Sequence, residues 1–491
     1  MTFNSWEFLL FYPIVLLLYF VLPKKLKWPM LLIASYYFYM CYQAQLVFLI
    51  FGTTLISWIA SNIIERTENK ALRKACLAVT LIVCLGVLFF YKYFNFLAGS
   101  VVSLISYFGG NPSPVALNLI LPVGISFYTF QTLSYVIDVY RGDVQTEKNF
   151  FFYALFVSFF PQLVAGPIER PGNLIPQLIE PKPWNTSDAV KGAKHMMVGF
   201  FKKVCVADIL SLYVNEIYND VASATAFGVI VATALFAVQI YCDFSGYTDI
   251  AIGCARVMGI RLMKNFDHPY TATTIKEFWG RWHISLSTWF KDYLYFPLGG
   301  SRCKKPRHLF NLFVVFLVSG LWHGAAWTYV IWGVIHGLYQ IIGNLTLPIR
   351  NRLLGRVKLS PKSLPVVIFR RIGVFILVCF AWLFFRANSM ADAVSLLRTL
   401  FVTGWDVGLK DALTSMNLIS AETGIVPLLI CLCSVLILLM IDFTLKYEDE
   451  EGGSYLLVKN GAFVYFVWII MFAWAILLSQ DIASTFIYFQ F

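Results

Sequence analysis

Long apolar runs recur along almost the whole chain, and this feature constrains the fold more than any other. A transmembrane helix needs about 20 predominantly apolar residues. The apolar runs lie near residues 7–22, 28–42, 45–64, 75–91, 115–137, 150–165, 225–242, 309–322, 327–347, 369–385, 425–445 and 462–480. With 59% hydrophobic and only 13% charged residues, the chain differs from soluble enzymes and from disordered proteins. We expect an all-α, polytopic integral membrane protein with about eleven transmembrane helices.

The charged residues between the runs predict the orientation in the membrane. The net charge of +11 comes from 38 Lys and Arg against 27 Asp and Glu. Lys24, Lys25 and Lys27 follow the first run, and the basic segment 66–74 follows the third. Because cytoplasmic loops are enriched in Lys and Arg, these loops are expected in the cytoplasm. Both chain termini are then expected on the outer side of a cytoplasmic (inner) membrane. The sequence has no basic stripe with interleaved aromatic residues, so nucleic-acid binding is not expected.

Two polar stretches do not fit simple spanning helices. Residues 161–220 begin with several prolines and continue as an amphipathic segment, and residues 266–300 combine aromatic with charged side chains. Non-helical backbone at membrane depth is tolerated only where protein buries it or where it lines a cavity. We therefore expect re-entrant or interfacial helices around a central funnel or tunnel. The chain is expected to be one domain, with N-terminal helices (1–137), a catalytic core (138–347) and C-terminal helices (348–491).

His323 is the strongest candidate for a catalytic residue. It follows an apolar run that begins near His308, and 15 helical residues extend about 22 Å, so His323 should lie deep in the membrane. Gly320 and Gly324 flank it and would allow a substrate or another backbone to approach closely. A histidine with a near-neutral pKa is a suitable general base for a hydroxyl group. The alternative is a core histidine hydrogen-bonded to a neighbouring helix.

A second histidine, His283, lies in a polar stretch between Glu277 and Tyr293. The stretch is too polar for a lipid-facing helix and would suit a wall that binds a polar or phosphorylated substrate from the cytoplasmic side. Its other members of interest are Arg281, Trp282, Ser285, Ser287, Lys291 and Asp292. The alternative is an interfacial helix whose Lys and Arg side chains reach the membrane surface.

Two acidic residues, Asp243 and Asp249, follow the apolar run at 225–242. They would either orient a histidine or cap the next helix. A metal site is the weaker interpretation, because His323 and His336 are thirteen residues apart and no H-E-x-x-H motif occurs. No phosphate-binding loop, nucleophile elbow or dinucleotide fingerprint is present either.

Four motifs together resemble the membrane-bound O-acyltransferase superfamily. The resemblance rests on Pro161-Gln-Leu-Val-Ala-Gly-Pro167, Asp243-Phe-Ser-Gly-Tyr-Thr-Asp249, Arg281-Trp-His-Ile-Ser-Leu-Ser-Thr-Trp-Phe-Lys-Asp-Tyr293 and Leu321-Trp-His-Gly-Ala325. The chain is most similar to the alginate O-acetyltransferase membrane subunits, and peptidoglycan O-acetyltransferases and teichoic-acid D-alanyltransferases are further relatives. The likeness runs from Leu9 to Phe491.

The resemblance implies a function and the roles of particular residues. It implies that His323 and His283 are the two catalytic histidines, with His283 on the cytoplasmic side of a tunnel through the protein. Trp282 and Trp322, in the same motifs, would line the substrate path. It also implies transfer of an acetyl group from cytoplasmic acetyl-CoA, without a permanently bound cofactor, for O-acetylation of an envelope polysaccharide such as alginate or peptidoglycan. The implied partner is an extracytoplasmic SGNH-hydrolase-like acetyltransferase or another polysaccharide-modification protein.

The aromatic C-terminal tail, residues 486–491, matches the end of the alginate-type proteins and resembles the tail of the small partner in teichoic-acid D-alanylation. It suggests that Tyr488 accepts the acyl group, although an aromatic membrane anchor is the alternative. D-alanyl or other acyl transfer to an envelope polymer or lipid remains the alternative within the family. A secondary transporter or a scaffold would be alternatives from other classes, and a transporter is expected to have two halves with matching broken helices.

Overall fold

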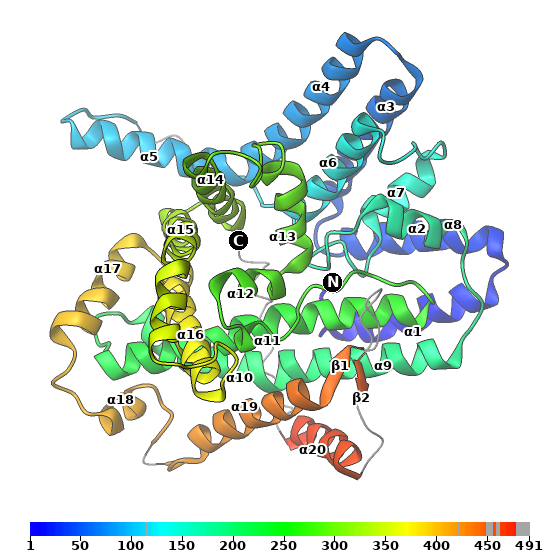
Figure 1. The fold of residues 1–491 in the computed structure, drawn as a ribbon. Coiled ribbons are helices and arrows are strands. Elements are labelled where there is room, and N and C mark those ends of the chain that lie inside the picture. The colour runs from blue at the N-terminus through cyan, green and yellow to red at the C-terminus, as the bar shows by residue number, and fades with distance from the viewer. Residues whose placement is uncertain (114–115, 421, 448–454, 458–461, 478–491) are drawn as a thin grey trace. The chain divides into compact units, whose positions relative to one another are not determined.

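The protein is predominantly helical in the computed structural model (Figure 1). The structure describes residues 1–113, 116–420, 422–447, 455–457 and 462–477. The chain forms two compact units. The first consists mainly of Met1–Met197 and Tyr247–Met263, and the second of Val198–Gly246, Lys264–Tyr447 and the described part of Tyr455–Phe491. The division into one domain with three segments remains a prediction.

The first unit contains the N-terminal helices. They are α1 (Trp6–Val21), α2 (Lys24–Met40), the 3-10 helix η1 (Ala44–Leu46), α3 (Val47–Arg66), α4 (Lys70–Leu88), the π-helical turn η2 (Phe89–Tyr93), α5 (Phe94–Tyr107), α6 (Ile125–Arg141), α7 (Phe150–Ser158), α8 (Pro171–Ile179) and α9 (Thr186–Phe200) up to Met197. Local signals set several of the boundaries. The side chains of Ser5, Asn69 and Asn149 accept hydrogen bonds from the first turns of α1, α4 and α7, as expected of N-cap residues.

The second unit contains the remaining elements. They are η3 (Phe201–Ala207, π-helical), α10 (Asp208–Asn219), α11 (Ala226–Val257) up to Gly246, η4 (Pro269–Thr271, 3-10), α12 (Ile275–Arg281), α13 (Ile284–Phe290), η5 (Lys291–Tyr295, π-helical), α14 (Lys305–His323), α15 (Trp327–Arg356), α16 (Leu364–Arg386), α17 (Met390–Arg398), η6 (Thr399–Thr403, π-helical), α18 (Leu409–Ser415), α19 (Val426–Thr444), β1 (Leu445–Tyr447), β2 (Tyr455–Leu457) and α20 (Ala462–Leu477). The two short strands pair antiparallel.

Several of these helices are long and apolar enough to span a bilayer. Among the described residues, five segments meet both criteria: Ala44–Arg66, Lys70–Tyr107, Ala226–Val257, Trp327–Arg356 and Leu364–Arg386. Shorter apolar helices cover Trp6–Val21, Val426–Asp442 and Phe466–Ala475. These helices establish the all-α membrane class, whereas the number of eleven transmembrane helices remains a prediction.

Two of the predicted apolar spans differ from straight helices. The run at 150–165 forms only the nine-residue helix α7, which extends about 14 Å and is too short to cross a hydrocarbon core of about 30 Å. The helix ends at Ser158, because proline disfavours helical continuation and Pro161 follows closely. The run at 115–137 becomes helical only at Ile125, after Gly124 in the left-handed conformation. A Cβ atom at Gly124 would lie 2.7 Å from the Leu163 carbonyl oxygen.

Aromatic side chains form a large part of the core of the second unit. Trp282, Trp332 and Trp382 are almost completely buried. Trp382 stacks on Trp332 with ring centroids 5.8 Å apart, and it lies 5.2 Å from Trp282. Pairs of this kind contribute about 0.5–1.5 kcal/mol beyond the area that they bury. The cluster joins α12, α15 and α16 around the segment that carries His283.

Candidate active site

Helix α14 carries His323 as its last residue. The helix is continuous from Lys305 to His323 and has a proline in its first turn, a position that proline favours. It ends because the next residue, Gly324, is extended, with φ −163° and ψ 153°. Helix α14 therefore breaks directly after His323. His323 is only 3% exposed, and the rings of Trp322, Trp332 and Phe385 lie 5.0–5.4 Å from its imidazole centroid.

Gly320, one turn before His323, allows another helix to approach closely. The sequence left open whether a substrate or another backbone approaches this glycine, and the structure shows that it is a backbone. A Cβ atom on Gly320 would lie 2.4 Å from the Tyr329 carbonyl oxygen, and one on Gly333 would lie 2.4 Å from the Phe316 carbonyl oxygen. Gly320 is thus used by the backbone of α15, as the adjacent course of α14 and α15 in Figure 1 also shows. This close crossing fixes the position of the last turn of α14 and with it His323.

His283 lies in the short connection between α12 and α13. Its backbone has φ 44°, a left-handed conformation that is uncommon for residues other than glycine and that is frequent at functional sites. The imidazole is completely buried. Its Nδ1 atom lies 3.1 Å from Asn265 Oδ1, which also accepts hydrogen bonds from the backbone N–H and the hydroxyl of Ser285.

The hydrogen bonds to Asn265 define the tautomer of His283. The Ser285 backbone N–H can only donate, so the Asn265 atom that receives it must be the amide oxygen. That oxygen cannot donate to His283, and Nδ1 of His283 must therefore carry the proton. Burial lowers the pKa of His283 to about 3, so the ring is neutral near pH 7. In a neutral ring protonated at Nδ1, the acceptor lone pair is on Nε2.

The two candidate histidines belong to the same unit and are linked by one aromatic side chain. The ring of Trp322 lies 5.9 Å from that of His283 and 5.0 Å from that of His323. The ring centroid of Phe244 lies 4.7 Å from that of His283. The structure thus brings His283, Trp322 and His323 together, with aromatic side chains around both imidazoles.

The remaining residues of the His283 motif have mainly structural contacts. Trp282 lies in the aromatic core, where it stacks on Phe278. Ser285 binds Asn265, and the Ser287 hydroxyl donates to the Trp282 carbonyl at 3.3 Å. Asp292 lies half-buried in η5.

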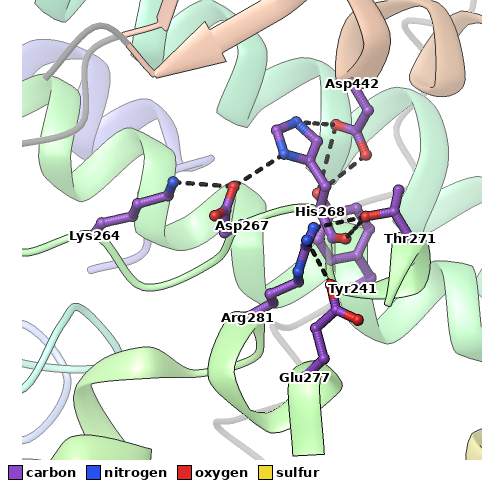
Figure 2. A network of polar contacts seen from close by, with 8 residues as sticks. All are labelled: Tyr241, Lys264, Asp267, His268, Thr271, Glu277, Arg281 and Asp442. Carbon is purple, nitrogen blue, oxygen red and sulfur yellow. Dashed lines mark hydrogen bonds and ion pairs between the residues drawn. The ribbon is translucent and has the colours of Figure 1, made fainter. Parts of the chain in front are cut away.

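Arg281, expected in a substrate-binding wall, is held by side chains of its own region. It forms an ion pair with Glu277 at 2.7 Å and donates to the Thr271 hydroxyl at 2.8 Å (Figure 2). Two backbone hydrogen bonds join the same segments, from Asp267 N–H to the Arg281 carbonyl and from Ile284 N–H to the Asn265 carbonyl. Arg281 therefore helps to position the loop that supplies Asn265.

The same loop forms a second set of polar contacts, also seen in Figure 2. Asp267 lies 3.0 Å from Lys264 and 3.2 Å from His268, and Asp442 faces His268 and accepts a hydrogen bond from Tyr241 at 3.2 Å. The hydrogen bond with His268 is the main cause that lowers the pKa of Asp267 below its usual range, and Lys264 adds to it. These contacts hold the loop after Met263 against α11 and α19.

Asp243 and Asp249 both lie inside α11, because the helix continues to Val257. They are therefore not caps of a following helix. Asp243 forms a buried ion pair with Lys203 Nζ at 2.7 Å, and Asp208 is 2.8 Å from the same nitrogen. In the first unit, Asp249 lies 3.9 Å from Nδ1 of the buried His195. The histidine that Asp249 faces is therefore His195, and not His283 or His323.

Sequence reasoning missed two of these groups. Asn265 lies immediately before the stretch 266–300, which the sequence marks as unusual. An amide side chain directly beside that stretch was the available signal for a positioning residue. Lys203 belongs to the segment 161–220, whose second part the sequence predicts to be amphipathic, whereas its side chain is completely buried. Two adjacent lysines before an apolar segment give no indication that one of them pairs with Asp208, five residues away, and with Asp243, forty residues away.

The described residues contain no group of three His, Cys, Asp or Glu side chains arranged to hold a metal ion. His336, the second histidine considered for a metal, accepts a hydrogen bond at Nδ1 from the Trp279 indole at 3.2 Å. The site contains the buried imidazoles of His283 and His323 in aromatic surroundings. Such a pair suits proton transfer to and from a substrate hydroxyl.

Comparison with known proteins places the chain in a family. The profile of the membrane-bound O-acyltransferase family, MBOAT, matches residues 143–385, which include all residues from Asp243 to His323 considered above. The chain is 38% identical to the probable alginate O-acetylase AlgI of Pseudomonas aeruginosa over 430 residues, which cover 86% of this chain and 79% of that protein.

Two further relatives differ in the reaction that their names describe. The chain is 33% identical to the peptidoglycan O-acetyltransferase of Helicobacter pylori, over 79% of this chain and 77% of that protein. It is 27% identical to the teichoic acid D-alanyltransferase of Bacillus subtilis, over 55% of this chain and 70% of that protein. From the family profile, the extent of these similarities and the apolar helices, we conclude that the chain belongs to the membrane-bound O-acyltransferase family and is an O-acyltransferase of a membrane.

Proposed function

We propose that the protein transfers an acetyl group from a cytoplasmic thioester, acetyl-CoA, across the inner membrane for O-acetylation of an extracytoplasmic polysaccharide. The observation that carries the proposal is the 38% identity to the probable alginate O-acetylase over 86% of the chain. The buried pair His283 and His323 supports it, because hydroxyl acylation needs a base in a site that excludes water. The acceptor polymer is alginate-like or peptidoglycan, by similarity to the relatives.

In the proposed reaction, His323 acts as the general base. Its imidazole removes the proton from the acceptor hydroxyl while the hydroxyl oxygen attacks the thioester carbonyl carbon. The C–O bond forms, and the negative charge moves to the carbonyl oxygen. Collapse of this tetrahedral intermediate breaks the C–S bond, and the imidazolium of His323 returns the proton to the leaving thiolate. A thioester is already activated, so positioning and oxyanion stabilisation supply most of the catalysis.

In the same proposal, His283 positions the acyl donor. Its neutral ring presents Nε2 as an acceptor for an N–H or O–H group of the donor, and the hydrogen bond to Asn265 holds the ring in that orientation. The basic loops assigned to the cytoplasm would attract the phosphates of acetyl-CoA.

The test is transfer of labelled acetyl groups in membranes that contain His323→Ala at normal protein level. We expect loss of transfer by about a hundredfold or more, the range of a missing general base. His308→Ala is the matched control, since His308 lies on the same helix near its other end. Undiminished transfer by His323→Ala would remove this residue as the base.

The acceptor step includes a proposal for Tyr488, which lies outside the described residues. We propose that the Tyr488 hydroxyl receives the acetyl group and passes it to a separate extracytoplasmic SGNH-hydrolase-like acetyltransferase. Tyr488→Phe should then abolish polymer acetylation in cells while acetyl-CoA still binds. Full polymer acetylation by this variant would leave the tail as an aromatic membrane anchor.

D-alanyl transfer is the second candidate, favoured by the similarity to the teichoic acid D-alanyltransferase. The two donors can be compared directly in membranes, with labelled acetyl-CoA in one reaction and a D-alanyl thioester in the other. Label incorporation from only the D-alanyl thioester would replace the acetyl proposal.

A further inference from the structure

A groove between the end of α15 and the beginning of α16 combines apolar walls with two arginines. Its volume is about 530 Å³, and its lining includes Arg350, Leu353, Phe369, Arg370, Val374 and Leu377. This volume lies within the range of small-molecule sites. All lining residues belong to the second unit.

The groove lies at a segment of the chain whose charged side chains are all basic. Residues 350–371 include seven Lys and Arg and no Asp or Glu. The described residues that line the groove likewise include no carboxylate. Arg350 donates from Nη2 to the Gly343 carbonyl at 2.8 Å, and this bond uses one of the five N–H donors of its guanidinium. The remaining donors and the Arg370 guanidinium are suited to phosphate.

The arginines and the apolar walls occupy different depths along the helices. Helix α15 has 30 residues and extends about 45 Å, longer than a hydrocarbon core of about 30 Å. Arg350 lies near its C-terminal end and Arg370 in the second turn of α16, so both belong to the same end of the helix pair. From Arg370 to Leu377 the groove continues for about 10 Å along α16 with Gly373, Val374 and Leu377 as lining residues.

A second groove of the chain provides an internal comparison. It lies between α1 and α2, has a volume of about 740 Å³, and is lined by apolar residues with Glu7 as its acidic side chain and without Lys or Arg. A groove of this kind would accept any acyl chain. What distinguishes the α15–α16 groove is therefore the pair of arginines and not its apolar surface.

We propose that the α15–α16 groove binds an anionic phospholipid of the membrane. Arg350 and Arg370 hold the phosphate, and Val374 and Leu377 contact the first part of an acyl chain. Basic pockets between transmembrane helices on the cytoplasmic side are suited to such head groups. The site is separate from His283 and His323, and its occupation does not depend on the acyl donor.

The test uses the full purified chain, stripped of lipid in detergent and titrated with phosphatidylglycerol or phosphatidylcholine, with bound lipid counted by native mass spectrometry. Phosphatidylglycerol should bind the native chain at least about tenfold more tightly than phosphatidylcholine, because only phosphatidylglycerol has a net negative charge to pair with the two arginines. The double variant Arg350→Gln/Arg370→Gln should lose this preference. Equal binding of the two lipids by the native chain would overturn the proposal.

Two further variants separate the groove from general surface charge. Gly373→Phe fills the groove and keeps both arginines, and a Cβ atom at this position meets nothing within 4 Å, so the fold should tolerate it. We expect it to lose the preference for phosphatidylglycerol. Lys70→Gln/Lys74→Gln removes two charges from an exposed basic segment and should keep the preference. Retention by Gly373→Phe, or loss in the Lys70/Lys74 variant, would indicate attraction by net charge alone and would contradict a defined site.

Discussion

Asn265 is the residue whose single side chain organises most of the candidate site. Its amide oxygen accepts three hydrogen bonds, one from His283 and two from Ser285, and its backbone carbonyl accepts one from Ile284. It touches neither donor nor acceptor in the proposed mechanism and is a positioning residue. Asn265 should therefore influence the reaction only by keeping His283 in the tautomer protonated at Nδ1.

Asn265→Ala should lower the turnover number for acetyl transfer by about fivefold to a hundredfold, because the lost hydrogen bond is worth about 1–3 kcal/mol in a buried site. The KM for acetyl-CoA should change less. Asn265→Asp, which retains the acceptor, should recover part of the rate. Initial rates at matched protein level measure both effects, and a variant that changed KM alone would argue against the positioning role.

The burial of His283 also makes a prediction about acid stability. In the unfolded chain a histidine takes up its proton near pH 6.5, whereas in the folded protein burial lowers the pKa of His283 to about 3. Between these values the unfolded state binds the extra proton, so the free energy of unfolding falls as the pH falls, by up to about 1.4 kcal/mol per pH unit.

His283→Asn removes this titration and keeps a residue type that tolerates positive φ. The free energy of unfolding of the variant, measured by denaturant titration in detergent between pH 6.5 and 4.5, should therefore fall less steeply than that of the native chain. Parallel pH dependences for the two proteins would contradict the burial of an uncharged His283.

At the scale of helices, the crossing of α14 and α15 positions His323. Gly333→Ala would place a Cβ atom 2.4 Å from the Phe316 carbonyl oxygen, and a backbone atom cannot move away as a side chain can. Overpacking of this kind costs about 1–3 kcal/mol. We expect a lower melting temperature together with lower acetyl transfer, since the last turn of α14 must shift.

Gly343→Ala is the control on the same helix, because a Cβ atom there meets nothing within 4 Å. Its melting temperature should equal or exceed that of the native chain, as alanine favours helix more than glycine. Equal melting temperatures for Gly333→Ala and the native chain would contradict the close crossing.

The elements also show what the sequence could predict. The apolar run after His308 was sufficient to predict the helix and the deep position of His323. The partner of Gly320 could not be predicted, because Gly333 belongs to another helix and no periodicity links the two. The importance of Asn265 was hidden for a similar reason, since it depends on the positive φ of His283, which brings three donors to one oxygen. Hydropathy alone wrongly predicted a spanning helix at 150–165. It counts apolar residues but takes no account of Pro161, which prevents the helix from continuing.

At the scale of the whole molecule, the distribution of Lys and Arg predicts which loops face the cytoplasm. The segment that ends α2 and precedes α3 is expected outside, and the segment around Lys70 inside. The chain offers a natural probe of this prediction, because Cys41 lies between α2 and α3 and is exposed, whereas the other cysteines are buried or partly buried. Its thiol should therefore react with reagents that cannot cross the membrane.

A membrane-impermeant maleimide should label the native chain in right-side-out membrane vesicles, and Cys41→Ser should remove most of the label. In the Cys41→Ser background, Lys70→Cys places an exposed thiol on the opposite side and should react only after the vesicles are opened. Labelling of Lys70→Cys in sealed vesicles, with protection of Cys41, would reverse the orientation. The acetyl donor would then have to reach the site from the side of the α2–α3 segment, and the basic loops could not attract a cytoplasmic thioester.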